Sequence, residues 1–342
     1  MKYLIVLVAA AVLYGCSPVG KEKRINILFE KANNKLDQQA YNDAIAIYDQ
    51  ILQMDADIPQ VYHNRGVAYF ETGHLVLALA DYNHILEENP DQHGIYFNRA
   101  RTYLELRRYE SCQLDVDYLK KQFPDSALVY FIEGLLLHHT DENKGALEAF
   151  DKSLELDGNN AETFANRGMV RFALEDYARA EMDLIASLKI DPGNAYPINA
   201  LALVKVEQKE LAIADSLINK ALRTLPDHPA FLNNRGYIYV LQGNLEQAET
   251  DIQASLKLDP ENAWGHQNLG LLYLESKEPL KAQESLKAAL DLNPNLKKAP
   301  AYLVRAYLAT GSTIEACQTL ANYPALKQAF PKEFAECEEK GV

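Results

Sequence analysis

Arginine and aspartate recur together along this sequence of 342 residues at one fixed spacing. Four arginines separated by multiples of 34 residues are each followed by an aspartate sixteen residues later, in the pairs Arg65 and Asp81, Arg99 and Asp115, Arg167 and Asp183, and Arg235 and Asp251. One interpretation is a basic stripe that binds a ligand. The joint occurrence favours a structural ion pair, because a planar guanidinium can meet a carboxylate through two hydrogen bonds where two helices cross closely.

The other residues capable of chemistry form no catalytic or metal-binding pattern. His138 and His139 lie near Asp141 and Glu142, but adjacent histidines at the end of a helix point in different directions, and no second cluster supports them. Glycine-rich phosphate loops, zinc-protease and nucleophile-elbow motifs are absent from the sequence. We therefore expect no cofactor, no metal and no enzymatic activity.

The elements that carry these residues repeat with a period of 34, without insertion, from Ile25 to at least Leu320. Positions are counted from the first residue of each unit. Position eight is glycine or alanine in eight of nine units, and position twenty is alanine except for Cys112. Such small residues allow two antiparallel helices to cross closely. The units begin at Ile25, Pro59, His93, Ala127, Ala161, Ala195, Pro229, Ala263 and Lys297.

These features resemble the tetratricopeptide repeat (TPR), and the resemblance covers nearly all of the chain after Arg24. It implies an all-α fold, an α-solenoid superhelix of nine TPR helical hairpins over 25–322, with a C-terminal capping helix in the cap at 323–342. In an oxidising compartment Cys317 and Cys337 would pair and fix this cap, or they would remain free, and the sequence leaves both alternatives open.

Asparagine occupies position six in five units. In TPR proteins this position faces the concave surface, and in some long TPR superhelices a ladder of such asparagines binds the backbone of an extended peptide. The resemblance offers two interpretations here, a peptide-binding ladder or repeat-consensus residues with local hydrogen bonds. The asparagines are Asn64, Asn98, Asn166, Asn234 and Asn268.

The lysine with which some TPR proteins clamp the acidic tails of chaperones is absent from position five. The inferred groove combines acids at position thirteen with apolar side chains, so we expect it to favour a partly apolar, neutral or basic protein segment. Some of its aromatic residues are expected to be buried between units. The candidate anchors are Phe97, Phe131, Tyr237 and Trp264.

The N-terminus has the pattern of an export signal. Lys2 supplies the positive start, and the apolar run that follows is too short to span a bilayer comfortably. The run ends before Cys16 in a sequence that resembles the bacterial lipobox, in which the cysteine is lipidated. We therefore expect a lipoprotein signal peptide at 1–15, a lipidated tether at 16–24 and attachment to a membrane through lipid on Cys16.

Ser17 follows this cysteine in place of the aspartate that retains enterobacterial lipoproteins at the inner membrane, and no acidic run comes after it. The resemblance therefore implies the cell envelope, at the outer membrane facing the periplasm.

The net charge of −14 argues against a nucleic-acid partner. The leading hypothesis is a non-catalytic, lipid-anchored scaffold or adaptor that binds protein partners in the bacterial cell envelope through its concave face. The alternative is a glycan-binding lipoprotein whose groove aromatics stack on sugar rings.

Overall fold

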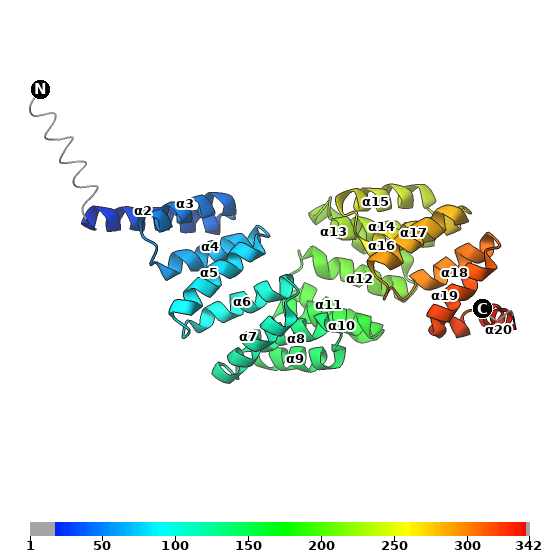
Figure 1. Cartoon of the computed structure of the whole chain (residues 1–342), viewed down its shortest axis with the longest axis horizontal. Coiled ribbons are helices and arrows are strands. Elements are labelled where there is room, and N and C mark those ends of the chain that lie inside the picture. Colours follow the sequence, from blue (N-terminus) through cyan, green and yellow to red (C-terminus); the bar gives the residue numbers. More distant parts are fainter. Residues whose placement is uncertain (1–17, 340–342) are drawn as a thin grey trace, which may run out of the picture. The chain divides into compact units, whose positions relative to one another are not determined.

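The computed structural model describes residues 18–339, which form helices joined by short turns. The chain divides into two compact units, Met1–Asn159 and Asn160–Val342. The first contains four helical hairpins, and the second contains five hairpins followed by two short helices (Figure 1). The predicted all-α solenoid of nine hairpins is confirmed.

Each hairpin pairs consecutive helices. The first unit contains α2 (Pro18–Asp37), α3 (Tyr41–Met54), α4 (Pro59–Glu71), α5 (Leu75–Glu88), α6 (His93–Glu105), α7 (Tyr109–Gln122), α8 (Ala127–His139) and α9 (Asn143–Leu156). The second contains α10 (Ala161–Ala173), α11 (Tyr177–Ile190), α12 (Ala195–Glu207), α13 (Leu211–Thr224), α14 (Pro229–Gln242), α15 (Leu245–Leu258), α16 (Ala263–Glu275), α17 (Pro279–Leu292), α18 (Ala299–Ala309), α19 (Thr313–Asn322), η1 (Pro324–Gln328) and α20 (Pro331–Glu339).

Seven hairpins begin at the residue that the period predicts, whereas the first and the last differ. Helix α2 already begins at Pro18, so residues 18–24, expected to be a tether, are helical. A proline in the first turn is compatible with this early start. At the other end Pro300 lies in the first turn of α18, and the helix begins at Ala299. Lys297 and Lys298 therefore lie in the loop before α18.

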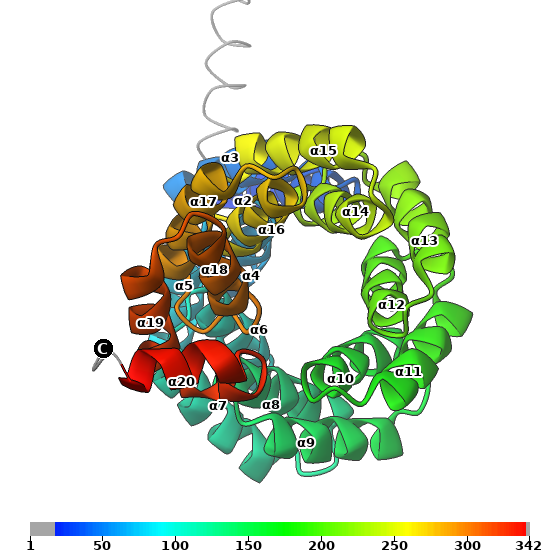
Figure 2. The ribbon, with the colours of Figure 1, turned by 90° about the vertical axis from the view of Figure 1, so that its right-hand side faces the viewer.

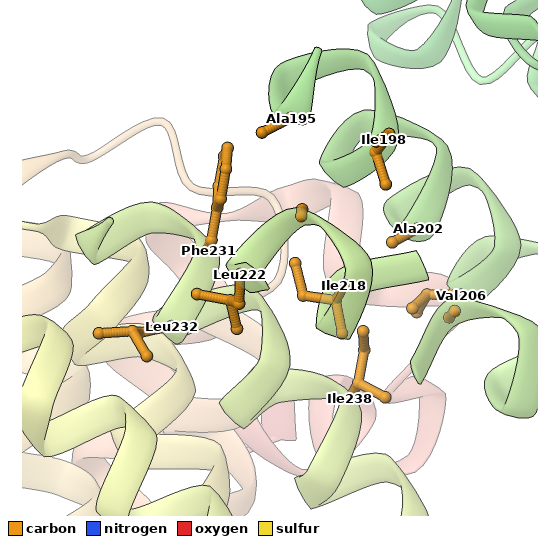
Figure 3. Packing of buried hydrophobic residues seen from close by; sticks show 11 residues of the cluster. Ala195, Ile198, Ala202, Val206, Ile218, Leu222, Phe231, Leu232 and Ile238 are labelled. Carbon is orange, nitrogen blue, oxygen red and sulfur yellow. The ribbon is translucent and has the colours of Figure 1, made fainter. Parts of the chain in front are cut away.

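Small side chains at positions eight and twenty set the close approach within each hairpin. A Cβ atom at Gly236 would lie 2.5 Å from Ile252 Cγ1, so a side chain there would require Ile252 or the two helices α14 and α15 to shift. Ala248, at position twenty of the same hairpin, is fully buried. Between hairpins the core continues from α12 and α13 to α14, where Ile198, Ile218 and Ile238 are among the buried residues in Figure 3.

Position fifteen has a left-handed backbone in all nine hairpins. It is the turn residue between the two helices, and its φ lies between 55° and 80°. Glycine occupies it in three hairpins, at Gly73, Gly243 and Gly311. Six hairpins place other residues there: Gln39, Arg107, Asp141, Glu175, Lys209 and Lys277. These six accept a conformation that costs an L-residue about 1–2 kcal/mol.

The C-terminal cap covers the open end of the ninth hairpin. Leu326, Phe330 and Phe334 pack on a buried cluster that includes Val304 and Leu320. Cys317 and Cys337 form a disulfide with a Cα–Cα distance of 5.5 Å, which joins α19 to α20. Of the two alternatives for these cysteines, the structure has the paired one.

Cys16 and the predicted signal peptide lie outside the described residues. Among the helices of residues 18–339, none combines the length and the apolar character needed to cross a bilayer.

Candidate functional site

The two helices of each hairpin have different surroundings in the second unit. Figure 2 shows α10, α12, α14 and α16 along the inner side of its arc, with α11, α13, α15 and α17 behind them on the outer side. The first helices of the hairpins therefore supply the inner surface, and positions five and six of the repeat lie on these helices.

The four arginines at position seven bind the aspartates at position twenty-three of their own hairpins. In the pair of α6 and α7, Arg99 Nε donates to Asp115 Oδ2 at 2.9 Å and Nη2 donates to Oδ1 at 2.6 Å. The same two-bond geometry joins Arg65 to Asp81, Arg167 to Asp183 and Arg235 to Asp251. The aspartates are buried, so these guanidinium groups hold the hairpins together and form no basic stripe for a ligand.

Arg65, Arg99 and Arg235 also bind the preceding hairpin. The Nη1 atoms donate to position twenty-five of the previous second helix: Arg65 to Asp49 at 2.6 Å, Arg99 to Asn83 at 2.9 Å, and Arg235 to Asn219 at 3.0 Å. Each guanidinium thus links three helices. Sequence reasoning missed this contact, although the acid or amide at position twenty-five is a visible signal.

The asparagines at position six also make internal hydrogen bonds. Three donate through Nδ2 to position five of the preceding hairpin: Asn98 to His63 at 2.9 Å, Asn234 to Asn199 at 2.8 Å, and Asn268 to Asn233 at 3.0 Å. Asn64 donates to Asn33 Oδ1, and Asn166 donates to the carbonyl of Glu162. We call the bonds between positions five and six the inter-hairpin ladder. Its amide groups stabilise the contacts between hairpins.

Two of the predicted groove residues are core residues. Asn268 is 5% exposed, and Phe131 is 4% exposed with its ring 6.1 Å from that of Phe150. Burial between helices removes both from the surface available to a partner. Phe97 is half-buried against Phe123, and Tyr237 is half-buried on the inner side. Trp264 is the most exposed of the predicted anchors, at 57%.

The ladder is interrupted between α10 and α12. Positions five and six hold Ala165 and Ala200 there, and methyl groups form no hydrogen bond. A cavity of about 580 Å³ opens at this place. Its volume falls within the range of about 300–1,000 Å³ typical of ligand sites. A second cavity, beside Phe70 in the first unit, measures about 70 Å³ and is too small for such a ligand.

The lining of the larger cavity combines apolar and polar groups. Met169 and Ala165 contribute apolar surface, while Glu162 and Asp191 contribute carboxylates. Tyr196 is 59% exposed, and its ring stands edge-on to Phe231 at 5.6 Å between centroids. This arrangement is suited to one apolar side chain, with acids nearby that favour a neutral or basic neighbour.

The histidine pair has ordinary structural partners. His138 Nδ1 lies 2.8 Å from Asn143 Oδ1, and the ring of His139 stacks on Tyr109. Within residues 18–339 no cluster of three or more histidine, cysteine, aspartate or glutamate side chains is arranged to hold a metal ion.

Family models agree with the repeat. Models described as tetratricopeptide repeat match residues 29–93, 97–161 and 265–296, and a model described as TPR repeat matches residues 236–277. Comparison with curated proteins at the level of sequence finds no match.

Solved structures with the same fold share little sequence with this chain. The crystal structure of the APC/C hetero-tetramer Cut9–Hcn1 is 21% identical, with a TM-score of 0.67, and the match covers 86% of this chain and 58% of that one. The human IFIT1 dimer with m7Gppp-AAAA is 17% identical, with a TM-score of 0.58 over 86% of this chain and 73% of that one. PilF from Pseudomonas aeruginosa is 18% identical, with a TM-score of 0.50 over 61% of this chain and 96% of that one.

Proposed function

Because the chain carries tetratricopeptide repeats folded as a solenoid, we propose that it is a non-catalytic scaffold that binds a partner protein on the inner face of its second unit. TPR proteins bind protein or peptide partners. In this proposal an apolar side chain of the partner enters the cavity between α10 and α12, and Tyr196 covers it.

The observation that carries the proposal is the position of the cavity. It opens where the ladder lacks its side chains, at Ala165 and Ala200, and the neighbouring contact between Asn199 and Asn234 is closed by a hydrogen bond. The local stacking of hairpins is therefore kept while one pocket stays open. A pocket that combines apolar side chains with convergent polar groups is typical of ligand sites.

We further propose that the scaffold is anchored by lipid on Cys16 and works in the bacterial cell envelope, at the outer membrane facing the periplasm. The lipobox-like sequence supports the anchor. The disulfide between Cys317 and Cys337 supports an oxidising compartment, because disulfides persist there and are rare in the cytosol.

Selection from a displayed library of random dodecapeptides tests the peptide site. The bait is the full chain in detergent, and selected peptides are measured by fluorescence polarisation. The key variant is Ala165→Phe, since phenylalanine already occupies position five at Phe29, Phe97 and Phe131 and is compatible with the fold. We expect it to fill the cavity and weaken binding at least tenfold. Ala178→Phe, on the exposed surface of α11, is the matched control and should leave affinity unchanged.

Unchanged affinity in Ala165→Phe, with an unchanged far-ultraviolet circular dichroism spectrum, would exclude the cavity as the anchor site. The glycan alternative is retained because Tyr196 and Trp264 are exposed aromatic rings. A glycan array with the same variants separates the two functions, and binding of oligosaccharides without any selected peptide would support the alternative.

A further inference from the structure

The loop before α18 makes contacts with distant helices of the second unit. Lys298 Nζ donates to Glu207 Oε1 at 2.8 Å, across 91 residues of sequence, and to the Tyr237 hydroxyl at 3.2 Å. Lys297 Nζ donates to Glu175 Oε1 at 3.2 Å, across 122 residues. Two lysines at the start of the ninth hairpin thus reach the turn after α10 and the C-terminal end of α12.

The groups around Lys298 form a site for a cation. Glu207 supplies a carboxylate that is 26% exposed, and the Tyr237 ring lies 5.5 Å from the ammonium, close enough for a cation–π contact. Burial alone would lower the pKa of Lys298, but its bonds with Glu207 and Tyr237 outweigh burial and raise it well above the ordinary value. Burial also raises the pKa of the adjacent Tyr302 to about 12, so the Tyr302 hydroxyl stays neutral. We call Glu207 and Tyr237 the cation subsite.

We infer that the inner face of the second unit binds an extended protein segment at two points, an apolar side chain in the cavity and a lysine or arginine in the cation subsite, and that Lys298 occupies this subsite until the segment replaces it. The inference rests on the proposed peptide-binding function and adds the charge of the partner. Charge complementarity supports it, since the subsite already holds a cation from the chain itself.

Helix α12 carries a residue of each point, which fixes their spacing. Tyr196, at the cavity, and Glu207 lie eleven residues apart on α12. At a rise of about 1.5 Å per residue they are about 16 Å apart along the helix. An extended chain advances about 3.3 Å per residue. The partner therefore needs its basic residue about five positions from its apolar anchor.

Replacement of Lys298 is feasible because its side chain is 44% exposed. An ion pair at such a site contributes modestly, so a partner's lysine or arginine competes on nearly equal terms. Lys297 and Lys298 lie in the loop before α18, so their side chains can move aside without unfolding a helix.

The test uses a peptide selected in the dodecapeptide experiment that has a basic residue about five positions from its apolar anchor. Its binding is compared with that of a synthetic version that has glutamine in place of the basic residue. We expect Lys298→Ala to bind the basic peptide about two- to fivefold more tightly than the wild-type chain does, and to bind the glutamine peptide with wild-type affinity. The Glu207→Gln variant should bind the basic peptide and the glutamine peptide with equal affinity. Lys220→Ala, on the exposed side of α13, is the matched control for loss of one positive charge.

Equal binding of both peptides by Lys298→Ala, or selection of peptides without a basic residue at this spacing, would overturn the two-point site. If Ala165→Phe still abolished binding in that case, the anchor cavity would stand alone. If Ala165→Phe had no effect, the proposed function itself would fall, and the cation subsite with it.

Discussion

Asn234 Nδ2 donates a hydrogen bond of 2.8 Å to Asn199 Oδ1 and links α14 to α12. The bond between Asn268 and Asn233 links α16 to α14 in the same way, and both of those side chains are buried. Buried amides need such partners, because an unpaired one would cost about 1–3 kcal/mol. In these hairpins asparagine at position six is therefore a contact between hairpins. The proposed surface for a partner lies between α10 and α12, where Ala165 and Ala200 form no such bond.

Restoring the contact should close the site. In the double variant Ala165→Asn with Ala200→Asn, we expect a hydrogen bond between α10 and α12 like that between Asn199 and Asn234. The free energy of unfolding should rise by about 1 kcal/mol, and peptide binding should be lost. Urea denaturation and fluorescence polarisation measure the two effects. Ala165→Asn alone is the control, since its amide lacks the designed partner. Retained binding in the double variant would contradict the role of the cavity.

The pair of Arg99 and Asp115 is expected to be coupled energetically. Loss of either partner leaves a desolvated charge, so each single change to leucine should destabilise the fold by about 3–5 kcal/mol. The double change should cost less than the sum of the two single changes, because Leu201 and Leu217 occupy the same two positions in the sixth hairpin. A double-mutant cycle by urea denaturation should give a coupling of about 0.5–3 kcal/mol. Additive effects of the two single changes would mean that the pair contributes no interaction.

The period of 34 determines what can be predicted within one hairpin. Small residues such as Gly236 and Ala248 identify where helices cross, and the joint occurrence of Arg99 and Asp115 identifies both ends of an ion pair. These contacts depend on residues at fixed separation in one repeat. Their geometry is therefore the same in every hairpin that carries them.

Features that depend on several hairpins were not predicted. The cavity results from two alanines in different units, and neither Ala165 nor Ala200 is unusual by itself. The contact of Lys298 with Glu207 depends on how successive hairpins rotate relative to one another. It also depends on the start of α18 at Ala299, two residues later than the period predicts. Burial of Phe131 also depends on how its hairpin packs. No local pattern of residues encodes these relations.

Position fifteen offers a test of backbone strain. Lys277 has φ of 61°, and Lys277→Gly should raise the free energy of unfolding by about 0.5–1 kcal/mol, since glycine accepts this conformation without a steric penalty. Gly243→Ala should lower it by about 1–2 kcal/mol, although no neighbouring atom obstructs the added Cβ. Urea denaturation of both variants measures the change. An unaffected Gly243→Ala variant would mean that the turn adjusts its backbone freely.

The proposed anchor depends on Cys16. Cys16→Ala should release the protein from membranes or block its processing, because acyl chains on this cysteine provide the attachment. Membrane fractionation and the mass of the intact protein measure the two outcomes. Cys112→Ala is the control, since Cys112 is buried at position twenty, where the other hairpins carry alanine. Unchanged fractionation together with unchanged mass in Cys16→Ala would show that the lipobox was misidentified.

His63 makes the first unit sensitive to acid. Its Nε2 accepts a hydrogen bond of 2.9 Å from Asn98 Nδ2, so the ring must be neutral at this nitrogen, and burial lowers the pKa of His63 below its ordinary value of 6.5. The unfolded chain therefore binds the proton more readily than the folded one. Stability from this site is present above about pH 6.5 and is lost as the pH falls through the lower folded pKa.

His63→Asn isolates this effect, because asparagine occupies position five at Asn199 and Asn233 and accepts the same bond without titrating. The stability difference between the wild-type chain and this variant should change in favour of the variant as the pH falls from 7 to 5. Comparing the two proteins cancels contributions from His139 and His228, whose pKa values burial also lowers. Urea denaturation at each pH measures the difference. Parallel pH profiles would mean that His63 binds its proton equally well in the folded and unfolded states.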